Sequence, residues 1–250
     1  MRSTSFWQHG VSAPDFAPLR DKVTADVCVI GGGIAGLTTA HLLAEAGLSV
    51  AILEAINLAA GETARSTAHI AIPDDRFTRL LRRFGDEGAR QIVQSFGAAI
   101  DLIESIVVRQ GIDCDFRRLD GFLVSCDASP LEALQEEHDA ALALGVACEL
   151  TPSAPAELAQ FGPALRFMGQ AQFNPFKYIV GLAESLPRNV RIYCGTRAIA
   201  IDETAEGVIV RTDGGGTVAF IDGSLEKVAN HLASLGRLAR QSWSPKRKSR

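Results

Sequence analysis

Three glycines and one acid have the residue types and the spacing that bind a dinucleotide. Gly31, Gly33 and Gly36 lie at GxGxxG spacing, and Glu54 follows them in the chain. Gly31 allows a tight turn, Gly33 lets the backbone approach a pyrophosphate, and Gly36 lets a helix lie close against a sheet. The amides at the start of that helix then face the phosphates with the positive end of the helix dipole. A carboxylate at Glu54 can accept hydrogen bonds from a ribose diol.

These residues need a strand–turn–helix–strand unit to position them, and the surrounding sequence has that pattern. Val27–Ile30 is an apolar run typical of a strand buried on both faces, and a helical run follows to Ala46. Val50–Leu53 predicts a second strand that ends at Glu54. The order of these parts favours a dinucleotide site over a ligand-free, glycine-rich turn. Because the acid disfavours a ribose 2′-phosphate, NADP is the least expected dinucleotide.

The segment after the second strand, residues 57–70, is rich in small and hydroxyl side chains. A loop at this place leaves the carboxyl ends of the strands, which is the ligand side of such a sheet. Its glycine permits close backbone approach, its hydroxyls can hydrogen-bond, its arginine can pair with a phosphate, and its histidine can reach a ring system. The residues concerned are Gly61, Thr63, Ser66, Thr67, Arg65 and His69. The alternative is that the loop is only a polar connector.

Composition indicates a soluble globular protein. Of the 250 residues, 47% are hydrophobic and 22% are charged, which allows a sizeable core. Apolar runs fall short of the roughly 18 residues that span a bilayer, and the amino terminus lacks the apolar core of a signal peptide. Scattered cysteines predict reduced thiols in a cytoplasmic protein, and neither a zinc nor an iron–sulfur site. They are Cys28, Cys114, Cys126, Cys148 and Cys194.

Charge is divided unevenly along the chain. Residues 221–250 hold seven Lys and Arg against two acids, which is a net charge of +5. Because the net charge of the whole chain is −4, residues 1–220 have a net charge of −9. An acidic body gives no support for binding to nucleic acid. The expected partner is a small molecule, with neither nucleic acid nor a membrane span.

The chain predicts five successive parts, in which an insertion interrupts a dinucleotide-binding unit. They are an amino-terminal arm over 1–24, a βαβ part over 25–73, an inserted helical and strand region over 74–174, a return over 175–220, and an atypical helix with a basic tail over 221–250. In the arm, Phe6 and Trp7 are expected to pin the segment to the body.

Helical periodicity and apolar runs predict the remaining elements. In order they are helices over 74–110 and 130–144, a strand over 121–126, a strand and turn over 164–175, a helix over 175–185, a parallel strand over 190–194, and a β-meander at 198–201, 208–211 and 217–221. Gly85 is expected to break the first of these helices.

In this order of parts, the chain resembles the glutathione-reductase-like FAD fold and, more narrowly, the D-amino-acid oxidase and glycine oxidase superfamily. Within that superfamily it is most similar to FAD-dependent oxidoreductases of the gamma-glutamylputrescine oxidase kind. The resemblance covers about Ser5–Val218. It lies in SFW near the start, ADVCVIGGGIAGLTTAHLLAEAGLSVAILEA, the GETARSTAHI loop, GIDCDF and QAQFNPFKYIVGLAESL.

The resemblance implies an α/β fold: a Rossmann-like FAD-binding domain with a β-meander, and an inserted α+β region that is part of a substrate domain. It places the pyrophosphate on the glycine turn, the ribose on Glu54, the 61–69 loop along the pyrophosphate, and the adenine near the backbone of Ala198. The implied cofactor-binding residues are Gly31, Gly33, Ile34, Ala35, Gly36, Glu54, Ala55, Gly61, Thr63, Arg65, Ser66, Thr67, His69 and Ala198. Glu62 and Arg65 depart from the small residues usual in this loop.

The activity implied is oxidation of an amine or amino acid by hydride transfer to FAD. The family's substrate groups come largely from a carboxyl-terminal part that has no counterpart here, so catalytic residues are not assigned. The alternatives are a catalytically inactive FAD-binding or partner-binding fragment of the family, and an NAD-binding domain.

Beyond Phe220 the sequence lacks the strand signal expected of the family, which predicts a chain truncated or altered at its carboxyl end. The sheet would then lack the strand that flanks Val27–Ile30. An exposed sheet edge favours self-association.

Overall fold

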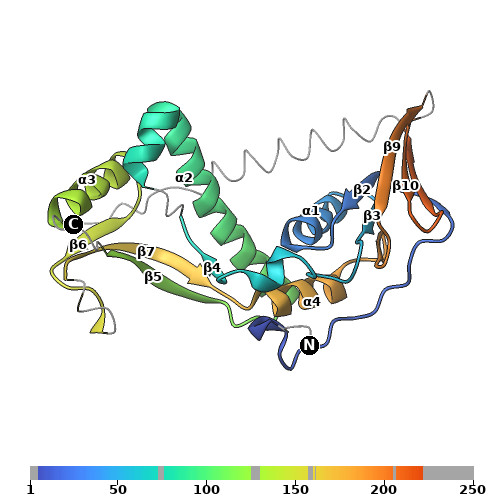
Figure 1. Ribbon diagram of the computed structural model, residues 1–250, viewed down its shortest axis with the longest axis horizontal. Coiled ribbons are helices and arrows are strands. Elements are labelled where there is room, and N and C mark those ends of the chain that lie inside the picture. The colour runs from blue at the N-terminus through green and yellow to red at the C-terminus, as the bar shows by residue number, and fades with distance from the viewer. Residues whose placement is uncertain are drawn as a thin grey trace. The chain divides into compact units, whose positions relative to one another are not determined.

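The computed structural model describes residues 5–72, 76–124, 130–156, 160, 162–204 and 207–221, and the chain divides into two compact units. The first unit contains the described residues up to Ala68, Ile106–Cys114, and those from Asn174 onward. The second contains the described residues of His69–Ser105 and Asp115–Phe173 (Figure 1). The helix and basic tail predicted for the end of the chain lie outside the described residues.

The first unit is built on three parallel strands in the order β2–β3–β8. They are β2 (Val27–Ile30), β3 (Val50–Leu53) and β8 (Val190–Tyr193), and α1 (Ile34–Glu45) connects the first two. These elements confirm the predicted βαβ unit and the third strand. The expectation that β2 is buried on both faces is wrong, because Ile30 is 54% exposed. In the part of the chain that is described, β2 forms an edge of the sheet, whereas β3 lies in the middle and is buried throughout.

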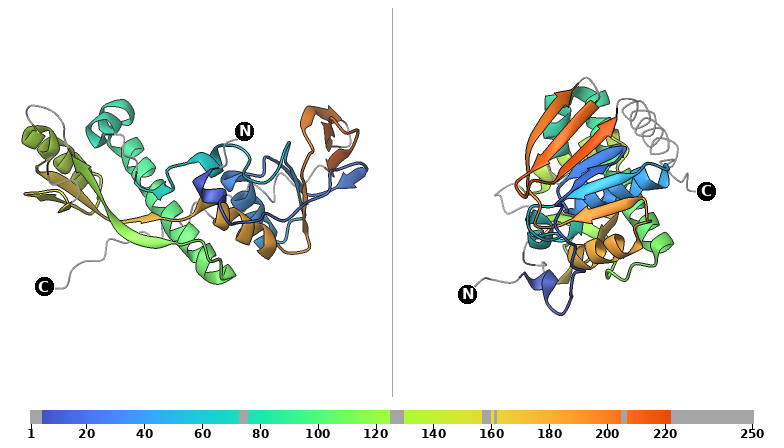
Figure 2. Two further views of the ribbon diagram at one scale, coloured as in Figure 1. Left: turned by 60° about the horizontal axis from the view of Figure 1, so that its bottom comes forward. Right: turned by 90° about the vertical axis from the view of Figure 1, so that its right-hand side faces the viewer.

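A second sheet packs on one face of these strands, with α1 on the other face (Figures 1 and 2). Its order is β1–β11–β10–β9, formed by Lys22–Thr24, Thr217–Ile221, Gly207–Thr212 and Ala198–Thr204. The last three strands confirm the predicted meander. β1 corrects the expectation of a loop, since its three residues are too few to show a pattern until they pair with β11. The shared core joins Leu19, Ala25, Ala51, Leu53, Val210 and Val218.

α4 (Pro175–Ser185) packs against α1, and the two helices are shown side by side in Figure 1. Asn174 caps α4 because its side-chain oxygen accepts hydrogen bonds from the amides of Phe176 and Lys177. The hydroxyl groups of Tyr178 and Thr38 lie 3.1 Å apart and hydrogen-bond the two helices. The prediction that Pro175 begins a helix is therefore confirmed.

The second unit is an antiparallel sheet covered by two helices. Its strands are β4 (His69–Ile70), β7 (Ala164–Gln172), β5 (Arg117–Val124) and β6 (Cys148–Thr151). Its helices are α3 (Pro130–Ala143) and α2 (Phe77–Gln110) as far as Ser105; the last residues of α2 belong to the first unit. Gly85 has φ of 65° and kinks α2, as predicted. The predicted strand over 121–126 begins earlier, at Arg117, and Cys126 lies outside the described residues. The short strands β4 and β6 were not predicted, because each forms through its pairing with β7.

Among the described helices, α2 is long and apolar enough to cross a membrane when only its length and composition are considered. That evidence is weak. Phe77, Leu80, Ala89 and Val93 of the same helix belong to the apolar core of the second unit.

His41 is a buried histidine on α1, with 2% of its surface exposed. Its Nε2 lies 3.5 Å from Glu45, and neither ring nitrogen makes a hydrogen bond to the described part of the chain. Burial lowers the pKa of His41; the charge of Arg109 lowers it further, and Glu45 opposes the change. The neutral imidazole is therefore the form that the folded protein accommodates.

Stability is expected to fall as the pH drops below about 6.5, the ordinary pKa of histidine. In that range the unfolded chain binds a proton that folded His41 does not bind. His41→Leu should flatten the dependence of the urea midpoint on pH between pH 8 and 5, and His9→Gln, at an exposed site, should not. Equal slopes in His41→Leu and the parent protein would contradict this assignment.

Two cysteines are expected to react slowly in the folded protein. Burial raises the pKa of Cys28 to about 11, and burial together with the charge of Asp139 raises that of Cys148 to about 11. Only about one thiol in a thousand is then ionised at pH 8, and the thiolate is the reactive form. Alkylation followed by peptide mass spectrometry should label both residues rapidly only after denaturation. Rapid labelling of the native protein would show that the thiols are accessible.

Candidate functional site

The glycine turn lies at the carboxyl ends of β2 and β3, where the predicted βαβ unit places it. Gly31 has φ of 111°, a conformation that favours glycine, and its amide donates to the carbonyl of Leu53 at 2.8 Å. This hydrogen bond joins the start of the turn to the end of the neighbouring strand. The tight turn predicted at Gly31 is present.

Glu54 points at this turn. Its Oε2 accepts the amide of Gly32 at 2.7 Å, and its Oε1 accepts the amide of Ile56 at 2.9 Å. The carbonyl of Gly32 in turn accepts the amide of Ala59 at 3.0 Å. Gly32 is therefore held by the protein through both of its backbone groups. The half-buried carboxylate of Glu54 has further lone pairs on both oxygens with which to accept hydroxyl groups.

The last glycine of the motif has no room for a side chain. A Cβ on Gly36 would overlap the carbonyl oxygen of Gly31 and would lie 3.1 Å from the carbonyl carbon of the same residue. The first turn of α1 is thus packed directly on the glycine turn. The structure accordingly provides a packing reason for the glycine at this position.

The start of α1 presents its backbone amides at the same place. Gly33 is the N-cap, and the first turn consists of Ile34, Ala35 and Gly36, whose amides have no carbonyl partner within a helix. The hydroxyl of Thr63 accepts the amide of Ile34 at 3.1 Å. Thr63 therefore covers one amide of a helix start that otherwise suits an anion.

The remaining candidates of the loop lie near this helix start or at the surface of the first unit. Thr63 and Arg65 belong to a short 3-10 helix, η2 (Glu62–Arg65). Gly61, Ser66 and Thr67 are exposed, and Arg65 is paired only loosely with Glu62, at 3.9 Å.

Three further predicted residues lie outside this loop. Ala55 follows Glu54 and is half-buried, and Ala198 is the first residue of β9. His69 belongs to the second unit, where it is exposed and pairs with Gln172 in the sheet.

Several residues that support the site were not among the sequence candidates. The amide of Thr196 donates to the carbonyl of Glu54 at 2.8 Å, and Gly195 donates to Ile56 at 2.9 Å, so two backbone hydrogen bonds fix the acid's segment. Trp7 donates through Nε1 to the carbonyl of Ser66 at 2.9 Å, which confirms that this aromatic pins the arm. Phe6 does not pin it, because it is 81% exposed. Contacts made by backbone atoms leave little signal in the types of side chain.

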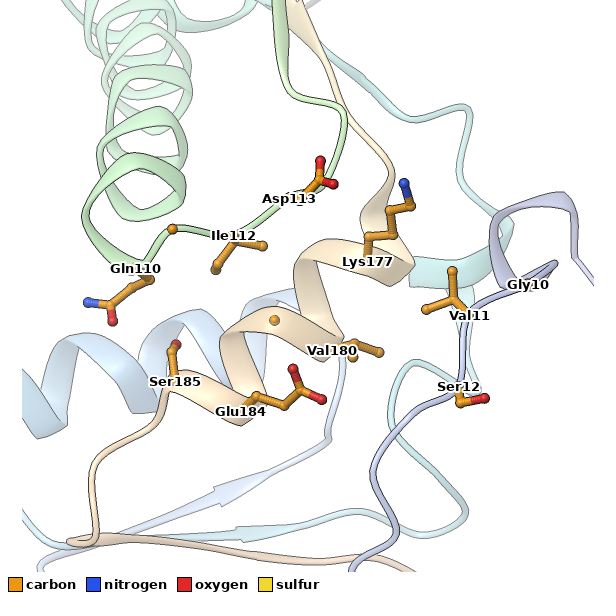
Figure 3. A pocket seen from close by; sticks show the side chains of 12 residues that line it. Gly10, Val11, Ser12, Gln110, Ile112, Asp113, Lys177, Val180, Glu184 and Ser185 are labelled. Carbon is orange, nitrogen blue, oxygen red and sulfur yellow. The ribbon is translucent and has the colours of Figure 1, made fainter.

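A cavity of about 620 Å³ in the first unit lies at a different place, between α4, residues 10–12 of the arm and residues 110–113 (Figure 3). Its walls mix apolar and charged side chains, with Asp113 and Lys177 at one end and Glu184 and Ser185 at the other. The glycine turn and Glu54 do not line it. The cavity therefore adds no residue to the dinucleotide site.

The donors and acceptors at the glycine turn fit a dinucleotide. The turn offers close backbone approach at Gly31 and Gly33, an amide-rich helix start, and the carboxylate of Glu54 at the neighbouring strand end. The hydroxyl of Thr63 lies over this helix start, 3.1 Å from the Ile34 amide and 3.1 Å from the place of a Cβ on Gly33. A hydroxyl can accept from an amide and also donate to a ligand, so Thr63 does not exclude a phosphate.

Comparisons with known proteins agree with this geometry. A model of the family described as FAD dependent oxidoreductase matches residues 26–230. The chain is 33% identical over 199 residues to the "Putative Rieske 2Fe-2S iron-sulfur protein" of Bacillus subtilis, covering 79% of this chain and 39% of that protein. It is 32% identical over 135 residues to gamma-glutamylputrescine oxidoreductase of Escherichia coli, covering 52% of this chain and 32% of that protein. The chain thus spans less than half the length of these relatives.

Among solved structures, the L-amino acid deaminase from Proteus vulgaris with its specific insertion sequence deleted matches with a TM-score of 0.64 and 23% identity. The match covers 86% of this chain and 55% of the deaminase. Identity at this level shows the fold alone. Together with the family model, it identifies an α/β FAD-binding fold.

Proposed function

Because the chain belongs to the family of FAD dependent oxidoreductases, we propose that it binds FAD at the glycine turn and oxidises an amine or an amino acid. The observation that carries this proposal is the position of Glu54. The carboxylate lies next to a turn formed by Gly31 and Gly33, and hydrogen bonds from Gly32 and Ile56 orient it. A ribose and a pyrophosphate need an acid and a bare backbone in this relation.

In the proposed site, the residues of the turn and of the helix start hold the pyrophosphate: Gly31, Gly33, Ile34, Ala35 and Gly36. Glu54 accepts the ribose hydroxyls, and the backbone near Ala55 and Ala198 borders the adenine. Residues of the loop that belong to the first unit follow the pyrophosphate toward the flavin: Gly61, Thr63, Arg65, Ser66 and Thr67. The proposed subclass is the glutathione-reductase-like FAD fold, and the proposed location is the cytoplasm.

The proposed substrate class is supported by the names of two similar proteins, an oxidoreductase of gamma-glutamylputrescine and an L-amino acid deaminase. When bound, FAD supplies the acceptor for a hydride from the carbon beside the substrate nitrogen. The chain's own contribution is to bind and orient the cofactor through the turn, the helix start and Glu54. Groups that contact the substrate are not assigned within the described residues.

The absorption spectrum of the purified protein tests the proposal. Flavin bands near 370 and 450 nm, as expected for this cofactor, that bleach under anaerobic conditions on addition of an amine or amino acid would support both binding and turnover. Bands that persist with a panel of such substrates would favour the alternative, an FAD-binding protein without this activity. A colourless protein that neither takes up added FAD nor retains it would overturn the proposal. If such a protein bound NAD, the alternative of an NAD-binding domain would take its place.

A further inference from the structure

The amino-terminal arm is fastened to the loop that carries Thr63. The arm forms a short 3-10 helix, η1 (Phe6–Gln8), and Trp7 donates through Nε1 to the carbonyl of Ser66 at 2.9 Å. The hydroxyl of Ser5 donates to the carbonyl of Ala64. Both acceptors are backbone carbonyl groups at the end of η2, so the arm holds the backbone of the loop in position.

The arm is itself held in place. The amide of Trp7 donates to Ser5 Oγ at 3.3 Å, and the amide of Ser5 donates to Gln8 Oε1 at 3.3 Å, which is a capping box. Asn174, the residue that caps α4, donates to the carbonyl of Trp7 at 3.5 Å. The arm therefore links the end of η2 to a helix that is packed in the core of the first unit.

Thr63 is the residue through which this link reaches the glycine turn. Its hydroxyl accepts the amide of Ile34 at 3.1 Å and lies 3.1 Å from the place where a Cβ on Gly33 would stand. The hydroxyl proton is left to donate elsewhere, because the oxygen is the acceptor of the Ile34 amide. Because the amides and the dipole of the helix start favour negative charge, an anion is the acceptor that suits this position.

We propose that the arm is a positioning element of the dinucleotide site, which sets Thr63 so that its hydroxyl donates to a phosphate oxygen while it accepts from Ile34. This inference rests on the proposed binding of FAD. Thr63 contacts the pyrophosphate, and Trp7 and Ser5 act through Thr63. The ligand chemistry concerned is a pyrophosphate; the adenosine end is held by Glu54 and is independent of the arm.

Calorimetric titration with ADP and with adenosine separates these two ends of the ligand. Thr63→Val should weaken the binding of ADP and of FAD about 10-fold and leave the binding of adenosine unchanged. Thr63→Ser keeps the hydroxyl and should keep the affinity of the parent protein. Trp7→Phe, which removes the indole N–H, should also weaken the binding of ADP. His9→Ala, at an exposed position in the same segment, is the matched control and should change the affinity for neither ligand. The double variant Trp7→Phe/Thr63→Val should bind no more weakly than Thr63→Val alone.

Equal losses for ADP and adenosine in Trp7→Phe would show general destabilisation and overturn the inference. Unchanged ADP affinity in Thr63→Val would overturn it as well, while FAD binding itself would still stand. Hydrogen exchange of the ligand-free protein supplies a readout that needs no nucleotide. Trp7→Phe should speed exchange of the Ile34 amide, and an unchanged rate would overturn the coupling even if the parent protein binds no FAD.

Discussion

Gly36→Ala is expected to destabilise the first unit strongly, although alanine is the better helix former. A Cβ at this position would overlap the carbonyl oxygen of Gly31 and would lie 3.3 Å from a methyl group of Val29. Relief requires the start of α1 to move away from the glycine turn, because backbone atoms cannot rotate aside. Overpacking of this kind costs about 1–3 kcal/mol, which outweighs the gain of about 1 kcal/mol in helix propensity.

Urea denaturation and FAD retention measure this effect. Gly36→Ala should lower the midpoint of unfolding, and the displaced helix start should also weaken the binding of FAD. For the unfolding midpoint the control is Gly61→Ala, because a Cβ at Gly61 would meet no atom within 4 Å among the described residues and the residue has φ of −87°. If Gly36→Ala proved as stable as the parent protein, the close approach of helix and turn described here would be wrong.

Glu54→Ala is expected to give the largest loss in affinity for FAD. The substitution removes an ionised acceptor that faces the ribose, and it leaves the amides of Gly32 and Ile56 without their partner. Hydrogen bonds to a charged group contribute about 1.5–3 kcal/mol each, so the dissociation constant should rise about 100-fold. The amides can be solvated in part, because the site is only half-buried.

Fluorescence titration with FAD measures this loss, and Glu54→Gln separates charge from shape. Glu54→Gln keeps one oxygen acceptor but turns an amide group toward a backbone N–H, so it should lie between Glu54→Ala and the parent protein. Glu87→Gln, on an exposed acid of the second unit, controls for the change in net charge. Tight binding of FAD by Glu54→Ala would show that Glu54 is not part of the FAD site.

The elements that position the site could be predicted from the sequence because their signals are local. The apolar runs, the glycine spacing and the helix periodicity around Gly31 and Glu54 depend on near neighbours in the chain. β1 escaped prediction because Lys22–Thr24 gains its strand character only from distant β11. The burial of β2 was overestimated because its composition matches a central strand, and position in a sheet is a tertiary property.

The site itself was predictable in its chemistry and less so in its contacts. The spacing of Gly31, Gly33 and Gly36 indicated a bare turn, and the turn is present. The sequence offered Thr63 as a hydroxyl for a ligand, whereas the structure shows it bonded to Ile34. The acceptors of the arm are the carbonyls of Ala64 and Ser66, and backbone carbonyls are common to all residues.

The pairing of β1 with β11 has a consequence for the order in which the chain folds during synthesis. Lys22 pairs with Thr217, and the segments of the first unit lie on both sides of the second unit in the chain. The ribosome therefore releases His69–Phe173 before β8 and the meander exist. The second unit can reach its native pairing early. In the first unit β2 and β3 can pair early as well, whereas β1 can pair with β11, and β3 with β8, only after the second unit has been translated.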